Sequence, residues 1–119
     1  MSKAEFQVRF QKQTGKNTLF PFGFHCSGSP IPAAAKRLER EIASGKIVGS
    51  EDTKTQYEIM QQLGIPEDSI GEFRDPNHWI SYYPPLNKTD LIDFGVAVDW
   101  DRSFITTSAN LYYDKFVRW

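Results

Sequence analysis

The sequence predicts an α/β fold that forms one half of a doubly wound sheet, with extra short helices between its strands. Two apolar segments, 19–24 and 96–98, have the length and composition of strands. Segments with helical spacing or helix-capping residues precede, separate and follow them. The order helix, strand, helix, short helices, strand, helix is typical of sheets whose parallel strands are joined through helices. We expect one domain over residues 1–119.

The composition is that of a water-soluble protein. The 15 acidic side chains nearly balance the 14 basic ones, so no basic field exists to attract a nucleic-acid backbone. The single Cys26 excludes an internal disulfide and is typical of a reducing compartment. No apolar stretch has the length of a signal peptide or a membrane helix. We therefore expect a soluble intracellular protein with no membrane partner.

The first segment, 1–16, fits two kinds of secondary structure. Apolar residues alternate over 4–10, as in a strand, but the two phenylalanines among them lie four residues apart, as on a helix. Ser2 and Glu5 have the spacing of a capping box, and Gly15 supplies a stop. These end signals favour the helix.

The segment after the first strand predicts an amphipathic helix. Apolar residues over 31–42 recur at helical spacing, and Gly45 ends the element. Arg37 and Glu41 stand four residues apart and can pair, so we expect the charges to form a solvated face rather than an RNA-binding patch. The segment at about 45–55 mixes glycine, serine and charges, which predicts a flexible surface loop.

Two short helical segments come next. Thr55 and Glu58 have the spacing of a capping box before an apolar face, and Gly64 closes that helix. Another turn is expected over 65–73. A further helix over 87–94 ends before the second strand.

A brief aromatic helix is expected between these segments. Asp75 is the expected cap of this helix, and Pro76 stands in its first turn. The proline pair at 84–85 ends it. The helix carries Trp79, Tyr82 and Tyr83. These rings could stack on nucleobases, but packing against the rest of a larger protein is the favoured interpretation.

The second strand is followed by a charged cluster. Asp99 and Asp101 could suggest paired carboxylates for acid–base chemistry. We favour a structural role, in which Asp99 pairs with Arg102 across a turn and Trp100 lies in the core. The remainder is expected to be extended over 103–108 and helical over 110–119.

The first strand ends in the main candidate for a binding site. Ligands of open α/β sheets bind just beyond the carboxyl ends of strands, where His25, Cys26 and Ser27 lie. Gly23 and Gly28 lack a Cβ and allow close approach to the backbone. Adjacent strand residues point to opposite faces, so a Cys–His catalytic pair is not expected. A zinc site would need more ligands than one cysteine and two distant histidines.

These motifs resemble a known family. The strings FPFGFHCSGSPI, AAAKRLEREI and VDWDRSFITTSANLYYDKFVRW closely resemble leucyl-tRNA synthetase of the eukaryotic cytosolic and archaeal type. The resemblance covers the chain from Met1 to Trp119 except for about 45–55. It matches the region between the family's ATP-binding His-Ile-Gly-His motif and its editing insertion. Neither that motif nor the family's Lys-Met-Ser-Lys-Ser loop occurs in the sequence.

The resemblance implies a partial, Rossmann-like class I catalytic domain of a cytoplasmic leucine–tRNA ligase. The whole enzyme would use leucine, tRNA(Leu) and ATP with its magnesium, and this segment would bind the rest of the catalytic domain. We expect it to contribute the wall of the leucine and adenylate pocket, to hold no cofactor or metal itself, and to be inactive in isolation. The alternative is a non-catalytic fragment or an interaction module that uses an aromatic surface.

The resemblance also implies roles for single residues. His25 would lie on the wall of the amino-acid pocket, where a neutral imidazole can accept a hydrogen bond from the substrate's ammonium group. Phe22, Phe24 and Ser27 would contribute to the same wall, with at least one phenylalanine in the core. The remaining candidates, which would shape the turn or the framework beside the site, are Gly23, Gly28, Pro30, Asp99, Trp100 and Arg102. No catalytic side chain is expected in this segment.

Overall fold

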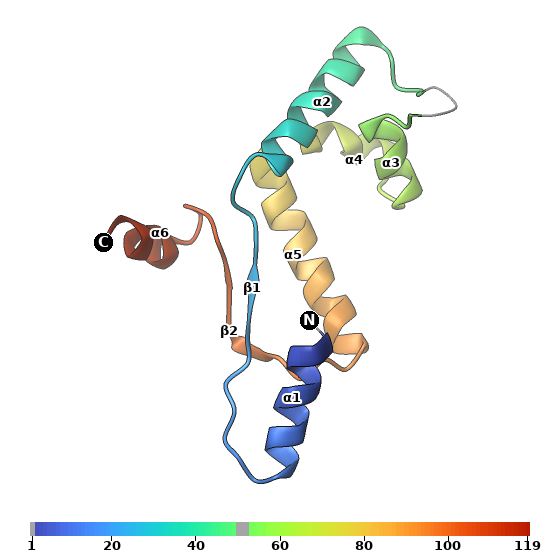
Figure 1. Ribbon diagram of the computed structural model, residues 1–119. Helices are drawn as coiled ribbons and strands as arrows, with labels where there is room; N and C mark the ends of the chain where they lie inside the picture. The colour runs from blue at the N-terminus through green and yellow to red at the C-terminus, as the bar shows by residue number, and fades with distance from the viewer. Residues whose placement is uncertain (1, 50–52) are drawn as a thin grey trace. The chain divides into compact units, whose positions relative to one another are not determined.

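The computed structural model describes residues 2–49 and 53–119, which group into two compact units (Figure 1). Unit 1 comprises Met1–Ser27 and Pro84–Trp119, and unit 2 comprises Gly28–Tyr83. Helices accompany a two-stranded parallel sheet, which confirms the predicted partial α/β fold. The one-domain assignment stays a prediction, and the predicted flexible loop includes residues 50–52, which lie outside the described part of the chain.

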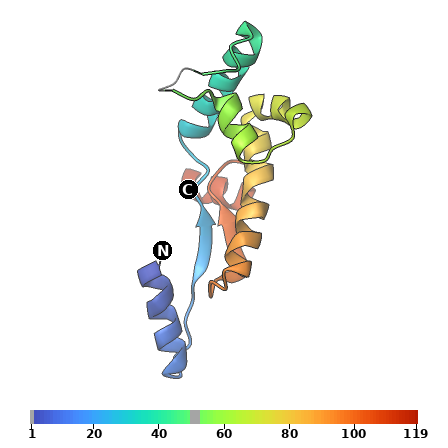
Figure 2. The ribbon, with the colours of Figure 1, turned by 90° about the vertical axis from the view of Figure 1, so that its right-hand side faces the viewer.

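Unit 1 contains the sheet. Strands β1 (Pro21–Phe24) and β2 (Asp99–Ile105) lie side by side and parallel (Figure 2). The pairing begins where the Asp99 N–H donates to the Phe20 carbonyl at 2.8 Å. An irregularity then interrupts the register before Phe24 reaches Ile105. The first strand was predicted nearly correctly.

The second strand was predicted too early in the chain. Segment 96–98 is not a strand, and the charged cluster that begins at Asp99 lies within β2 rather than after it. The reason is the helix before it. The Val96 N–H donates to the Leu91 carbonyl at 3.0 Å, with Gly95 at a φ of 77°, so the chain is still completing a helix end there. Apolar composition alone could not reveal this.

Helix α1 (Ser2–Gln13) confirms the predicted first helix but not its capping box. Ser2 already lies in the helix. The Glu5 carboxylate instead pairs with Arg9 and accepts from the Ala97 N–H at 3.2 Å, which joins α1 to the segment before β2. The hydrogen bond from Arg9 lowers the pKa of the Glu5 carboxyl.

Unit 2 is a small helical body with its own core. Its elements are α2 (Pro30–Ser44), α3 (Gln56–Gln62), α4 (Glu67–Ile70), the 3₁₀ helix η1 (Gly71–Arg74) and the first part of α5 (Pro76–Asp93). Gly45 ends α2 in the left-handed conformation, as predicted. The buried apolar side chains are Ala35, Leu38, Met60, Ile65, Ile70 and Phe73.

The aromatic side chains of α5 belong to this core. Phe73 is fully buried, and the rings of Trp79, Tyr82 and Tyr83 pack around it with centroids 5.0–5.8 Å from its own. The Trp79 indole N–H donates to the Phe73 carbonyl at 2.6 Å. These three rings are thus partly buried against a partner from the same unit, while the expected packing against a larger protein stays a prediction.

The prediction that the aromatic helix ends at the proline pair was wrong. Helix α5 continues through Pro84 and Pro85, although an interior proline removes a backbone hydrogen bond and costs about 3 kcal/mol or more. The aromatic packing on Phe73 holds the helix as far as Tyr83, the residue before the proline pair. The prolines stand where the chain passes from unit 2 to unit 1.

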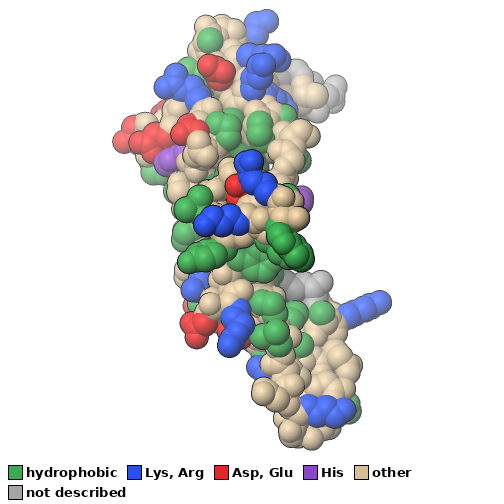
Figure 3. Space-filling view, turned by 90° about the vertical axis from the view of Figure 1, so that its left-hand side faces the viewer, with side chains coloured by type: hydrophobic (Ala, Val, Ile, Leu, Met, Phe, Trp, Pro, Cys, Tyr) green, Lys and Arg blue, Asp and Glu red, His purple; other side chains and the backbone are tan. Residues whose placement is uncertain are grey.

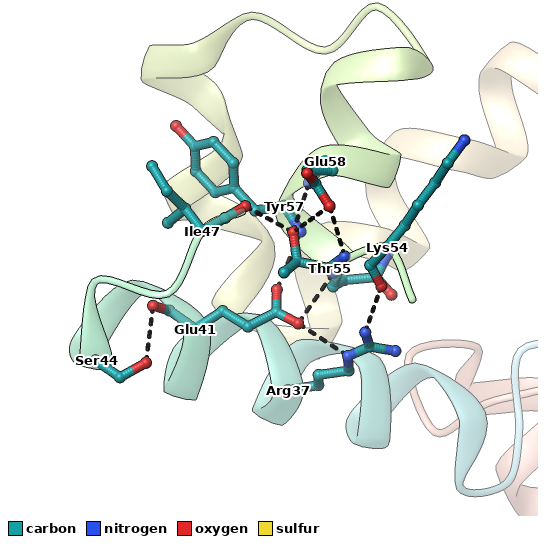
Figure 4. A network of polar contacts seen from close by, with 9 residues as sticks. Arg37, Glu41, Ser44, Ile47, Lys54, Thr55, Tyr57 and Glu58 are labelled. Carbon is teal, nitrogen blue, oxygen red and sulfur yellow. Dashed lines mark hydrogen bonds and ion pairs between the residues drawn. The ribbon is translucent and has the colours of Figure 1, made fainter. Parts of the chain in front are cut away.

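The first amides of α3 are held by two carboxylates (Figure 4). The predicted capping box is present, with Thr55 and Glu58 each accepting from the other's backbone N–H. The Glu41 carboxylate accepts from the N–H groups of Gln56 and Tyr57 at 3.0 and 3.1 Å. All four amides at this helix start are thus satisfied. The predicted solvated face of α2 therefore has one nearly buried member, Glu41, whose side chain is 12% exposed.

The ion pair predicted on α2 is confirmed and extends this network. Arg37 Nε lies 2.8 Å from Glu41 Oε1. Its guanidinium also donates to the Lys54 carbonyl at 2.6 Å, and the Thr55 hydroxyl donates to the Ile47 carbonyl at 2.7 Å. Helix α2 and the start of α3 are therefore joined by charge-assisted hydrogen bonds.

Substitution Glu41→Ala should lower the free energy of unfolding by about 1–3 kcal/mol, because two amides of α3 lose their acceptor. Urea denaturation followed by far-ultraviolet circular dichroism measures this change. The matched control is Glu39→Ala on the same helix, which removes an exposed carboxylate and should change stability by less than about 0.5 kcal/mol. Equal losses in the two variants would contradict the network.

Acid should weaken the start of α3. The Thr55 N–H that donates to Glu58 holds the pKa of this carboxyl below its usual 4.5. A depressed pKa contributes stability above the unfolded-state value, and that contribution is lost as pH falls through the folded-state value. In denaturation experiments from neutral pH to about pH 3, Glu58→Gln should therefore lose less stability than the unchanged chain. A parallel decline in both proteins would argue against this role of Glu58.

Candidate functional site

The carboxyl ends of β1 and β2 meet at one edge of the sheet in unit 1. Phe24 and Ile105, the last residues of the two strands, are partners in the register. The segment that follows β1 carries His25, Cys26 and Ser27, and Thr106 follows β2. The sequence-predicted candidates thus lie at the kind of edge where α/β proteins bind ligands.

Thr106 holds this edge together. Its hydroxyl accepts from the Cys26 N–H at 3.1 Å, lies 3.4 Å from the Ser27 hydroxyl and donates to the Phe24 carbonyl at 3.3 Å. Its own N–H donates to the same carbonyl at 3.1 Å. Thr106 was not among the predicted site residues, because the second strand was expected at 96–98. The available signal was the β-branched composition of the extended segment 103–108.

His25 is exposed at the end of β1. The side chain is therefore open to a ligand rather than enclosed by hydrophobic neighbours. Cys26 beside it is half-buried, and burial raises the pKa of its thiol. A thiol that stays protonated is a poor nucleophile, and the absence of a Cys–His pair stays a prediction.

An aromatic cluster joins the start of β2 to the side chains of β1. The rings of Phe22 and Phe24 stand edge to face with centroids 4.9 Å apart, and Trp100 lies 5.8 Å from Phe22. Lys88 Nζ lies 5.6 Å from the centroid of the Trp100 ring. All three aromatic residues are partly buried, so Trp100 is not the core residue that the sequence predicted.

The two glycines of the candidate site have different surroundings. A Cβ on Gly23 would lie 3.0 Å from the ring of Phe104, so the group that approaches this glycine is an aromatic side chain of β2. Gly28, in unit 2, has a φ of +98°, which favours glycine. Pro30 follows it as the first residue of α2, where its missing N–H costs nothing.

The charged cluster of β2 has a structural arrangement. Arg102 lies 2.6 Å from the Asp99 carboxylate, which confirms the predicted ion pair, although both residues lie in a strand rather than in a turn. Asp101 is exposed. Among the described residues, no group of three or more His, Cys, Asp or Glu side chains could hold a metal ion. No helix in the described part of the chain has the length and apolarity needed to cross a membrane.

Unit 1 leaves many apolar side chains uncovered, and Figure 3 shows hydrophobic side chains at the surface of one face. Every fully buried residue of the described chain belongs to unit 2. In helix α6 (Leu111–Arg118) and the residue after it, Tyr112 is 87% exposed, Phe116 71% and Trp119 99%. Phe6 and Phe94 line an open pocket of about 250 Å³ beside α1. Unit 1 thus exposes an apolar surface that its own described residues do not cover.

The chain is similar to leucine–tRNA ligases along its whole length, although no family model matches it. The cytoplasmic leucine–tRNA ligase of Saccharomyces cerevisiae is 38% identical over 155 residues, and that of Pongo abelii is 40% identical over 154. "Probable leucine–tRNA ligase, cytoplasmic" of Vairimorpha ceranae is 45% identical over 119 residues. Each alignment covers the whole chain but only 13–14% of the relative. The matching segments of the Saccharomyces cerevisiae and Pongo abelii proteins are therefore longer than this chain.

Substitution Trp100→Ala should lower the free energy of unfolding by about 1–2 kcal/mol, less than the 3–5 kcal/mol typical of a buried tryptophan, because the indole is only partly buried. Urea denaturation measures the loss. Trp119→Ala is the matched control, and its 99% exposed indole predicts a change below about 0.5 kcal/mol. A loss of 3 kcal/mol or more for Trp100→Ala would place that side chain in a core after all.

Proposed function

We propose that this chain, whose homologues over its whole length are cytoplasmic leucine–tRNA ligases, supplies the wall of the leucine and adenylate pocket of such an enzyme. The reaction is the ATP-dependent ligation of leucine to tRNA(Leu). Leucine, tRNA and ATP with its magnesium are then substrates of the whole enzyme. The names of the relatives also support a cytoplasmic location for it.

The observation that carries the proposal is the exposed imidazole at the strand edge. His25 follows β1 directly and is open to solvent. A neutral imidazole nitrogen can accept a hydrogen bond from the ammonium group of an amino acid. Phe22 and Phe24 supply apolar surface on the same strand, and Ser27 supplies a hydroxyl two residues beyond. These groups suit a substrate with one charged end and one aliphatic end.

The partner of this segment is the rest of the ligase catalytic domain. The relatives are several times longer than the chain, which covers 13–14% of each. Unit 1 has no fully buried described residue and exposes aromatic side chains such as Tyr112 and Trp119. A two-stranded sheet is marginally stable by itself and gains from additional strands and cover. The remaining catalytic domain would supply both.

We expect no catalysis by the chain alone, since its sequence contains neither ATP motif of the family. The alternative is a non-catalytic interaction module. Trp79, Tyr82 and Tyr83 are partly buried on Phe73, so that module would use the more exposed face of α6.

The test uses a chimeric ligase, in which this chain replaces the matching segment of the Vairimorpha ceranae protein, since that alignment needs no additional residues. Leucine-dependent ATP–pyrophosphate exchange should be present. In the chimera, His25→Ala should raise the KM for leucine about tenfold, the value of one good hydrogen bond to a charged group, and leave the KM for ATP nearly unchanged.

Two outcomes would contradict the proposal. An equal effect on leucine and ATP, or no effect, would remove His25 from the amino-acid pocket. A chimera without exchange activity, alongside an active host ligase and a folded segment, would favour the non-catalytic module.

A further inference from the structure

We propose that Thr106 is a positioning residue that aims His25 at the ammonium group of the substrate. The inference rests on the proposed function, because it concerns the side chain assigned there to substrate binding. Thr106 would act through the backbone on either side of His25 rather than through its imidazole ring.

The two peptide groups that flank the α-carbon of His25 are both bonded to Thr106. The carbonyl of the preceding peptide, from Phe24, accepts from the Thr106 N–H at 3.1 Å and from its hydroxyl at 3.3 Å. The N–H of the following peptide, from Cys26, donates to Thr106 Oγ1 at 3.1 Å. Since each peptide group is planar, anchoring both restricts φ and ψ of His25 and so fixes the direction of its Cα–Cβ bond.

The Thr106 hydroxyl is fully used in this arrangement. It has one hydrogen, which it donates to Phe24, and two lone pairs. One lone pair accepts from the Cys26 N–H, and the other is available to the Ser27 hydroxyl at 3.4 Å. Valine has the same shape but none of these capacities. Its introduction would leave the N–H of half-buried Cys26 without its acceptor.

The backbone conformation of His25 matters for substrate binding because its imidazole ring is exposed. His25 is exposed, so neighbouring side chains do not enclose its ring. A hydrogen bond to an ammonium group depends on the direction of the imidazole lone pair. Small errors in such positioning are costly in enzymes. The peptide groups that Thr106 holds therefore set the position and direction from which the His25 side chain extends, and rotation about its two side-chain torsions then orients the ring.

In the chimeric ligase, Thr106→Val should raise the KM for leucine about tenfold, the equivalent of one lost hydrogen bond, while the KM for ATP stays within about twofold. Thr106→Ser keeps the hydroxyl and should restore most of the leucine affinity. The matched control is Thr89→Val, which removes another threonine hydroxyl that donates to a backbone carbonyl in unit 1, that of Pro85 at 3.1 Å. This control should leave both KM values unchanged.

A double-mutant cycle separates positioning from a general loss of structure. If Thr106 acts through His25, the double variant His25→Ala/Thr106→Val should have the same leucine KM as His25→Ala alone. Additive effects, or a Thr106→Val variant with normal leucine KM, would overturn the inference and leave the proposed function standing. A normal leucine KM for His25→Ala would overturn both.

Amide hydrogen exchange gives a readout that does not depend on activity. In the chimeric ligase, Thr106→Val should accelerate exchange of the Cys26 N–H, which has lost its acceptor, and Thr106→Ser should not. Exchange at Ala33 N–H, which donates to the Ser29 carbonyl in unit 2, serves as the internal reference and should stay unchanged. Unchanged exchange at Cys26 would show that its N–H does not depend on Thr106, which also overturns the inference.

Discussion

The parallel pairing of β1 with β2 is the contact on which the candidate site depends. It brings Phe24 and Thr106, which are far apart in the sequence, within hydrogen-bonding distance at one sheet edge. The residues after β1 have no regular structure of their own, so their conformation comes from this contact. A site built in this way needs few packed side chains, because backbone groups and one hydroxyl determine the directions of the residues that face a ligand.

Some helix ends could be predicted from local signals, although Ser2 and Glu5 did not form the capping box that their spacing predicted. The capping box of Thr55 and Glu58 and the glycine stop at Gly45 appear in the structure as expected, since each needs only neighbours within a few residues. The errors concern the second strand and the expected stop at the proline pair. Segment 96–98 completes the end of α5 and binds Glu5 of α1 through the Ala97 N–H, and α5 continues through its prolines.

The candidate site was predictable in position but not in construction. A strand followed by His25 and glycines indicates a ligand-binding edge from general rules of α/β sheets. Nothing local to Thr106 indicates that its hydroxyl reaches Cys26, because that contact depends on the register of the two strands. Glu41 is a similar case. Its spacing from Arg37 predicts the surface ion pair, but not the two amides of α3 that it binds.

The network around Thr55 also bears on how long the connection between α2 and α3 can be. Its hydroxyl donates to the Ile47 carbonyl at 2.7 Å, so the two ends of the intervening connection are joined directly. A closed loop pays only about 0.6 kcal/mol for each doubling of its length. Evolution can therefore enlarge this connection, and a protein engineer can insert a reporter peptide there, while the anchored ends keep α2 and α3 together.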